Sequence, residues 1–555
     1  MSGVAAPSPP ESIAADIEAS PGANASFRSS WRESYGNTWW LDLAILGAIV
    51  FLLGAVQPLD DPDLPMHLAT GEWIVRHGMV PFTEPFAWTR MGAPFFAYSW
   101  ALEVPYYLLL RWIGPLGLHL LNGCMMLAAG ASVLLLGHVA RWKPWVSLCL
   151  AGYGIGVAVV VVSSLRPQLL LLSLVPLAWA FTYQMLRRER VRWAAVALVA
   201  TSAAAANTHL FFVLTAVPVV LCWIYPPADR RRSWAVCGCI LAGWLISPYA
   251  LVWPQVLALN FGHNALVAQP SPIAELRPGF SSGSLGIAFA AVLALIPWVI
   301  QHGMLSKRER LAYGALWLAG LVGFGLAGRL LLAWWLIMLP AAAAALEIAG
   351  RREQARPPRL AVRVATYAVA LLCTGVLVAS HAGAWREEGS VVSRTLPSPV
   401  APVLDPLADW LQCHTISGAH GRIYTWFNYG SYLVWRLPAY SSSIDGRGIF
   451  PDSVAQVEAL RSGWIAPRRF TTWSSADVAI IPRRFTVATV IDSSAAWGLV
   501  AWDRVEQEGA GQVGLWVRRD WWANAGRGPF PEQATRVGEH ALPVAGATCS
   551  GVATT

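Results

Sequence analysis

Long apolar runs separated by short polar connections dominate residues 40 to 382. The runs long enough to cross a bilayer lie near 40–58, 115–138, 146–164, 168–186, 193–208, 210–226, 233–250, 285–301, 311–328, 330–348 and 362–381. A helix of about 20 apolar residues spans the hydrocarbon core. The pattern therefore predicts an all-α polytopic membrane domain of about eleven transmembrane helices over 40–382. It is preceded by a disordered cytoplasmic tail over 1–39, which lacks the basic and apolar regions of a signal peptide.

Every second connection between these runs is basic. The basic groups are Arg141 with Lys143, and the segments 187–192, 229–232, 306–310 and 351–359. Cytoplasmic loops carry an excess of Lys and Arg, so these connections face the cytoplasm. With the tail inside and an odd number of spans, the residues from about 383 onward lie outside. We expect a multi-pass protein of the inner (plasma) membrane with a cytoplasmic N-terminus and an extracytoplasmic C-terminal domain.

Composition supports the bilayer as the main solvent. The chain is 55% hydrophobic and 13% charged, whereas a soluble chain carries roughly 25% charged residues. Most of the net charge of +8 sits in the short groups beside the runs, where it sets orientation. A basic chain of this kind therefore gives no reason to expect a nucleic-acid partner.

The segment 383–555 has the composition of a small α/β domain. Strand-like stretches lie between clusters of Gly, Pro, Ser and Asp, at 422–427, 431–437, 477–482 and 514–519. Aromatic side chains in this region suit either stacking on sugar rings or packing in a pair of strands, and they are Trp426, Tyr429, Tyr432 and Trp435. Cys413 and Cys549 form a disulfide or stay as two thiols.

The first external loop, 59–114, contains a short apolar segment of its own at 99–113. This segment is too short to span a bilayer, and aromatic residues flank its apolar positions, namely Trp100, Tyr106, Tyr107 and Trp112. It is predicted as a helix lying in the membrane interface. The alternative is that it begins the second span.

A dense group of acids directly follows the first run. Asp60, Asp61 and Asp63 lie within four residues, and Asp63 with Pro65 predicts the start of a helix that runs toward Gly78. Carboxylates at a helix N-terminus can serve simply as caps. His67 and Glu72 follow on the same short segment and add groups able to take a proton or to hold a cation.

The Asp61-Pro62-Asp63 motif resembles the GT-C class of membrane glycosyltransferases, which carry an Asp-x-Asp or Asp-Asp pair in the first external loop. The layout of spans, interfacial helix and external C-terminal domain resembles the same class. The segments 67–100, 426–438 and 442–448 are similar to a group of bacterial multispanning proteins grouped with these enzymes. The short motif is weak alone, so the resemblance rests on motif and topology together.

This resemblance implies an inverting transfer of a sugar from a polyprenyl-phosphate-linked donor to a glycan, lipid or protein acceptor of the cell envelope. Asp61 is then the candidate base, and Asp63 and Asp60 orient it. A divalent cation such as Mg²⁺ or Mn²⁺ is one way to offset charge on the departing phosphate, with Asp61 and Asp63 as its candidate ligands. Glu103 is a second acid that could join them.

Positive groups on the external side are candidates for binding the donor phosphate. They are Arg166, Arg277 and Arg329, which lie at predicted outside ends against the charge bias. Snorkelling to lipid headgroups is the alternative. His209 and Glu275 are further candidates at outside ends.

Two other functions remain open at this point. A transporter or flippase of lipid-linked glycans would carry charged residues inside the spans, whereas the polar groups here gather at external ends. A non-catalytic envelope assembly protein could keep the same fold without the chemistry.

Overall fold

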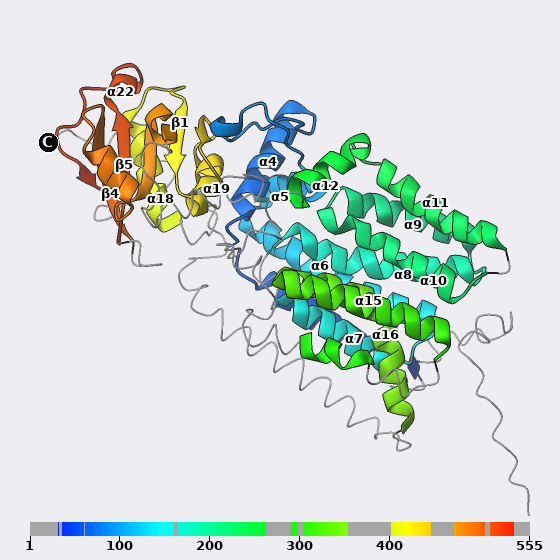
Figure 1. The fold of residues 1–555 in the computed structure, drawn as a ribbon. Helices are drawn as coiled ribbons and strands as arrows, with labels where there is room; N and C mark the ends of the chain where they lie inside the picture. Colours follow the sequence, from blue (N-terminus) through cyan, green and yellow to red (C-terminus); the bar gives the residue numbers. More distant parts are fainter. Residues whose placement is uncertain are drawn as a thin grey trace, which may run out of the picture. The chain divides into compact units, whose positions relative to one another are not determined.

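The computed structural model describes residues 31–32, 36–59, 61–159, 165–227, 229–261, 290–297, 305–352, 401–445, 471–505 and 511–537. The chain divides into two compact units. The first comprises Met1–Pro58, Leu116–Pro254 and Ile273–Val391, and the second comprises Leu59–Pro115, Gln255–Pro272 and Val392–Thr555. Figure 1 labels several of the helices and strands of both units.

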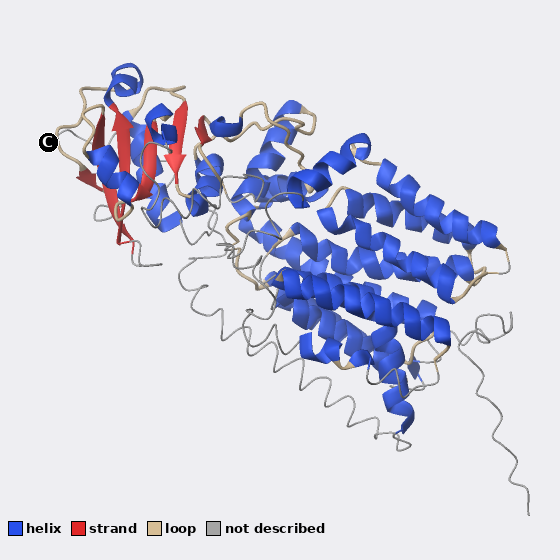
Figure 2. Cartoon of the chain, viewed as in Figure 1, coloured by secondary structure: helices blue, strands red, loops and turns tan. Residues whose placement is uncertain are grey.

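The described part of the first unit is helical, as its apolar runs predict (Figure 2). Its α-helices are α3 (Trp39–Ala55), α6 (Pro115–Ala140), α7 (Pro144–Val157), α8 (Leu171–Leu186), α9 (Val191–Ala206), α10 (Val220–Ile224), α11 (Arg230–Leu245), α15 (Lys307–Leu326) and α16 (Leu331–Arg352). Short 3-10 segments join some of them, namely η3 (Pro167–Leu170), η4 (Leu210–Val219), η5 (Ala250–Val252) and η8 (Gly328–Leu330). Helix α12 (Trp253–Phe261) lies across the boundary between the units.

Three helical stretches in the described residues are long and apolar enough to cross a membrane. They are Pro115–Ala140, Pro167–Leu186 and Leu331–Ile348. The pair Arg230–Leu245 and Ala250–Asn260, bent by 104°, adds a fourth if it is one span. The remaining predicted runs coincide with shorter helices, with α15, or with segments partly or wholly outside the described residues, such as 285–301 and 362–381. The total of about eleven spans therefore stays a prediction.

Small residues let the helices of the first unit approach closely. A Cβ on Gly54 of α3 would lie 2.9 Å from Gly123 Cα of α6, and Asn122 Nδ2 donates to the Gly54 carbonyl at 2.9 Å. A Cβ on Gly320 of α15 would lie 1.8 Å from the ring of Trp334 on α16. Contacts of this kind stabilise helix pairs in lipid, where burial of apolar surface gives little driving force.

The second unit combines the loop 59–114 with the C-terminal domain. The loop contributes α4 (Leu64–His77), η1 (Trp88–Arg90) and α5 (Trp100–Ile113). The domain contains α18 (Ala401–His414), β1 (Gly421–Thr425), α19 (Phe427–Arg436), β2 (Tyr440–Ser442), η10 (Thr471–Ser475), β3 (Val478–Pro482), α21 (Thr486–Asp492), β4 (Trp497–Val505), β5 (Gly511–Arg518), α22 (Arg519–Ala525) and β6 (Thr535–Arg536).

These strands form one sheet in the order β2-β1-β3-β5-β4-β6. Strand β1 is parallel to β2 and β3, while β5 runs antiparallel to β3 and β4. Side chains alternate along β3, so Val478 and Ile480 join one hydrophobic core while Ala479 and Ile481 join the other. The predicted small α/β domain is confirmed. Cys549 lies outside the described residues, so its predicted disulfide with Cys413 stays a prediction.

One predicted strand of this domain is wrong. Residues 431–437 belong to helix α19 and its end, so the aromatic residues around them do not form a pair of strands. Tyr429, Tyr432 and Leu433 share one face of the helix and pack into the core with α18. Their spacing of three and four residues decided the structure, although the individual residue types favour strands.

The loop 59–114 is joined to the edge of the sheet. Glu84 Oε1 accepts hydrogen bonds from the Phe86 and Ala87 amides at 2.8 and 3.0 Å, which shapes the turn before this contact. The Ser442 amide then donates to the Phe86 carbonyl at 2.9 Å, and Ala87 forms a parallel bridge with Ser442. Thr89 Oγ1 donates to the Ser443 carbonyl at 2.6 Å. The loop therefore extends the sheet beyond β2.

Candidate active site

Helix α4 carries the first part of the site. It starts after Asp63, has Pro65 in its first turn and ends at Gly78, which adopts the left-handed conformation with φ of 67°. The predicted helix from Asp63 to Gly78 is confirmed. The Asp63 side chain makes no capping hydrogen bond to the helix, so capping does not account for this carboxylate.

Asp61 is buried in the turn that precedes α4. The residue is only 2% exposed, and its Oδ1 accepts a hydrogen bond from the Asp63 amide at 2.8 Å. An asparagine oxygen could accept the same hydrogen bond. This contact therefore explains a polar residue at position 61. Asp60 lies outside the described residues.

Gly71 lets α4 and α5 come into backbone contact. A Cβ at this position would lie 2.1 Å from the Glu103 carbonyl oxygen and 3.0 Å from Tyr107 Cβ. Only glycine fits such a separation. One turn before Gly71, on the same side of α4, His67 Nδ1 lies 2.8 Å from Glu103 Oε1. The close contact of the two helices thus positions the imidazole against the carboxylate.

Two buried polar atoms of α5 have no hydrogen-bond partner among the described residues. They are Glu103 Oε2 and the Tyr106 hydroxyl, in residues 5% and 0% exposed. The Tyr106 ring meets the His67 ring edge-on, with centroids 6.3 Å apart. An unsatisfied buried polar atom costs about 1–3 kcal/mol, so native structures seldom keep one without a reason. A substrate hydroxyl or water would satisfy both atoms.

Electrostatics favours the charged form of His67. Burial alone lowers its pKa, but the hydrogen bond and charge of Glu103, with the charges of Asp63 and Asp61, outweigh burial and raise the pKa above 6.5. Burial, together with the negative charges of Asp61 and Glu103, raises the Tyr106 pKa well above its ordinary value. Tyr106 therefore stays protonated and can donate a hydrogen bond.

We call Asp61, Asp63, His67, Glu103 and Tyr106 the loop cluster. It combines carboxylates that can take a proton, an imidazole held toward its charged form, and a phenol that donates a hydrogen bond. In the charged form of His67, Nδ1 donates its proton to Glu103 Oε1, and the Nε2 proton is available to another partner. Such a cluster can deprotonate a hydroxyl and stabilise developing negative charge nearby.

The other predicted site residues are His209, Arg166, Arg329, Arg277 and Glu275. His209 Nδ1 accepts from the Phe211 amide at 3.2 Å and caps η4, which is a structural role. Arg166 directly precedes η3 in the first unit, and the Arg329 backbone lies in η8. Arg277 and Glu275 lie outside the described residues. A shared cavity that joins these groups to Asp61 stays a prediction.

The described residues contain no preformed cage for a divalent cation. Within the ranges given above, no three His, Cys, Asp or Glu side chains are grouped as metal ligands. Mg²⁺ is usually held by one or two carboxylates together with waters and substrate phosphate oxygens, and Asp61 and Asp63 would supply such carboxylates. A metal requirement stays a prediction.

Sequence reasoning missed two members of this arrangement, and both had a usable signal. Tyr106 and Tyr107 were expected to flank an interfacial helix, but both are buried inside the protein. Tyr106 follows Glu103 by three residues, which places both on one face of α5. Gly71 follows His67 by four residues, which marks that face of α4 as a contact surface. The segment 99–113 does not begin the second span, because α5 ends at Gly114 with φ of 79° before α6 begins. Its position in the membrane interface stays a prediction.

This chain is similar to several solved structures, whereas the two comparisons of its sequence found no match. No family model matches the chain, and no curated protein matches it. One similar structure is the archaeal oligosaccharyltransferase AglB from Archaeoglobus fulgidus, solved in complex with an inhibitory peptide and a dolichol-phosphate. Its sequence is 11% identical to this chain and the TM-score is 0.49. The match covers 81% of this chain and 70% of AglB.

Two more solved structures are similar. ArnT from Cupriavidus metallidurans, bound to undecaprenyl phosphate, is 13% identical with a TM-score of 0.46, over 86% of this chain and 98% of ArnT. The arabinofuranosyltransferase AftD from Mycobacteria is 16% identical with a TM-score of 0.47, over 87% of this chain and 41% of AftD. All three are GT-C glycosyltransferases, the class that the sequence resembles. At TM-scores below 0.5 they add no argument about activity.

Proposed function

We propose that this protein is a membrane glycosyltransferase that transfers a sugar from a polyprenyl-phosphate-linked donor to an acceptor of the cell envelope. The loop cluster is the observation that carries the proposal. It places buried carboxylates, an imidazole and unsatisfied polar atoms in the first external loop, where transfer at the outer face needs them. The inner membrane and the external C-terminal domain follow from the charge pattern.

In the proposed reaction Asp61 takes the proton from the acceptor hydroxyl. The acceptor oxygen attacks the anomeric carbon while the bond from that carbon to the phosphate oxygen breaks. Polyprenyl phosphate leaves with the bonding electrons, and the configuration at the anomeric carbon inverts. Each step conserves charge, because the proton moves to Asp61 and the negative charge moves to the phosphate.

The remaining members of the loop cluster assist this transfer. His67, held toward its charged form by Glu103, offers the Nε2 proton and a positive charge to the developing anion. Glu103 Oε2 and the Tyr106 hydroxyl offer an acceptor and a donor for the hydroxyl groups of the substrate. Arg166, Arg277 and Arg329 remain proposed partners of the donor phosphate.

Replacing Asp61 by asparagine tests the base. Asparagine keeps the size and the hydrogen bond to the Asp63 amide but cannot take the proton, so turnover should fall at least about a hundredfold at an unchanged melting temperature. The assay measures release of polyprenyl phosphate by purified protein, with a panel of polyprenyl-phosphate-linked sugars and an envelope extract as the acceptor.

Asp229→Asn is the matched control for this substitution. Asp229 also accepts a hydrogen bond from the amide two residues later, at 3.0 Å, but it caps α11 and is no member of the loop cluster. It should leave turnover unchanged. Equal rates for wild type and Asp61→Asn would remove Asp61 as the base. A wild type that consumes no donor in the panel would instead favour a flippase or an assembly protein.

A further inference from the structure

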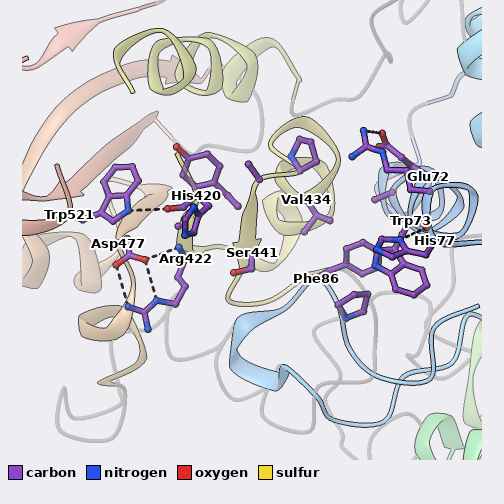
Figure 3. Close-up of a pocket in the computed structure, with 17 residues that line it drawn as sticks. Glu72, Trp73, His77, Phe86, His420, Arg422, Val434, Ser441, Asp477 and Trp521 are labelled. Carbon is purple, nitrogen blue, oxygen red and sulfur yellow. Dashed lines mark hydrogen bonds and ion pairs between the residues drawn. The ribbon is translucent and has the colours of Figure 1, made fainter. Parts of the chain in front are cut away.

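A cavity lined by both polar and apolar side chains lies in the same compact unit, between α4 and the sheet edge of the C-terminal domain (Figure 3). Its volume is about 590 Å³, within the range of about 300–1,000 Å³ that ligand sites occupy. Residues of α4 line one side and residues around β1, β2 and α22 line the other. The cavity is thus built by the loop and the domain together.

This cavity is separate from the loop cluster. Its α4 residues include Ala69, Glu72 and Arg76, whereas His67 and Gly71 face α5. With about 100° of rotation per residue, Ala69 and Arg76 lie roughly 180–200° around the helix from His67. A ligand in the cavity therefore occupies the opposite side of α4 from the proposed chemistry.

Aromatic rings on both sides of the cavity are held in fixed orientations. The Trp73 ring stacks on His77, with centroids 4.1 Å apart and planes at 16°. On the domain side, Trp521 Nε1 donates to the His420 carbonyl at 3.1 Å, and Tyr440 packs against the Trp521 ring at 6.2 Å. Rings fixed in this way lose little entropy when a ligand stacks on them.

The charged groups of the cavity are neutralised in pairs. Arg76 pairs with Glu72 at 2.5 Å, and the Arg422 guanidinium contacts both oxygens of Asp477 at 3.2 and 3.3 Å. An anionic ligand would have to compete with carboxylates already in place. A neutral ligand rich in hydroxyl groups can bind to the outer edges of both pairs, which offer donors and acceptors side by side.

We propose that this cavity binds a neutral oligosaccharide, namely a part of the acceptor glycan remote from the reacting hydroxyl. The apolar faces of sugar rings would stack on Trp73 and Trp521, and their hydroxyl groups would contact the two ion pairs. This assignment rests on the proposed transferase function and makes it more specific. It selects a glycan as the acceptor over a lipid or a protein.

Direct binding tests the assignment without any need for turnover. The purified full chain is titrated calorimetrically with maltohexaose, mannohexaose, galactohexaose and arabinohexaose. At least one hexasaccharide should bind, and Trp73→Ala and Trp521→Ala should each weaken that binding at least about fivefold. Trp112→Ala is the matched control, because Trp112 is 72% exposed on α5 and does not line the cavity. It should bind as wild type does.

Melting temperatures show whether the variants are folded. If Trp521→Ala fails to fold, Trp73→Ala decides, because Trp73 lies on a partly exposed helix face. Binding of no hexasaccharide, or binding that both substitutions leave unchanged, overturns the proposal. So does binding of inorganic phosphate in place of sugars, lost in Trp73→Ala, since it would identify an anion site.

The transferase and the oligosaccharide site can fail separately. Asp61→Asn should bind the same hexasaccharide as tightly as wild type does, because Asp61 does not line the cavity. If the wild type turns over the donor but binds no hexasaccharide, only the proposed oligosaccharide site is contradicted. Sugar binding in a wild type without turnover counts against the transferase, and the cavity would then remain as a glycan-binding site.

Discussion

Gly71→Ala tests whether the contact between α4 and α5 builds the loop cluster. The new Cβ would lie 2.1 Å from the Glu103 carbonyl oxygen, whereas ordinary contact begins near 3.4 Å. The obstructing atom is backbone, so it cannot rotate away. The helices must separate by about 1.3 Å at this point. The 2.8 Å contact between His67 and Glu103, one turn away, would then exceed hydrogen-bonding distance.

The expected loss of activity is larger than the loss of stability. Overpacking costs about 1–3 kcal/mol, and alanine regains about 1 kcal/mol of that through its helix propensity. The melting temperature should therefore fall by only a few degrees. A displacement of about 1 Å in catalytic groups can lower a rate about a hundredfold, so donor turnover should fall by roughly that factor.

Gly314→Ala is the control for this substitution. Gly314 lies within α15, and a Cβ there meets nothing within 4 Å. It should keep or slightly raise the melting temperature and leave donor turnover unchanged. Turnover in Gly71→Ala within about threefold of wild type would refute the reasoning, because it would show that the loop cluster tolerates separation of the helices.

Two further predictions concern pH and orientation. The pKa of His67 is raised above 6.5 in the folded state, so protonated His67 increases the free energy of unfolding. This increase is complete below pH 6.5, the pKa of the unfolded state, and is lost as the pH rises through the raised pKa of the folded state. The melting temperature of wild type should fall over this window while that of His67→Gln should not, and parallel profiles would exclude the effect. A reporter fused after Thr555 should be external and one inserted within 351–359 cytoplasmic, and the reverse result would overturn the orientation.

Local sequence signals predicted the helices of the loop 59–114. Asp63 and Pro65 mark the start of α4, and Gly78 and Gly114, both with positive φ, end α4 and α5. These signals act within one or two turns, so a single sequence contains all the information they need. The apolar runs likewise predicted the described helices of the first unit.

Contacts between distant segments could not be predicted in the same way. Trp88 Nε1 donates to the Ile423 carbonyl, 335 residues later, and no local pattern indicates that the loop extends the sheet. The strand predicted at 431–437 failed because residue types were weighed above the spacing of Tyr429, Tyr432 and Leu433. Asp61 was chosen from its place in a motif, whereas the spacing of Tyr106 from Glu103 places it on the same helix face but does not show that it is buried.

The energetic cost of the loop cluster favours a function over a structural role. A structural polar group would be expected to satisfy its own buried atoms, as the buried Thr425 does by donating from Oγ1 to the Ile480 carbonyl at 2.9 Å. Glu103 Oε2 and the Tyr106 hydroxyl instead remain without partners among the described residues, at a cost of about 1–3 kcal/mol each. Phenylalanine at 106 would remove one of these costs. Retaining the hydroxyl is reasonable if a substrate completes its hydrogen bonds during the reaction, because the same desolvated atoms then bind that substrate more strongly than they would in water.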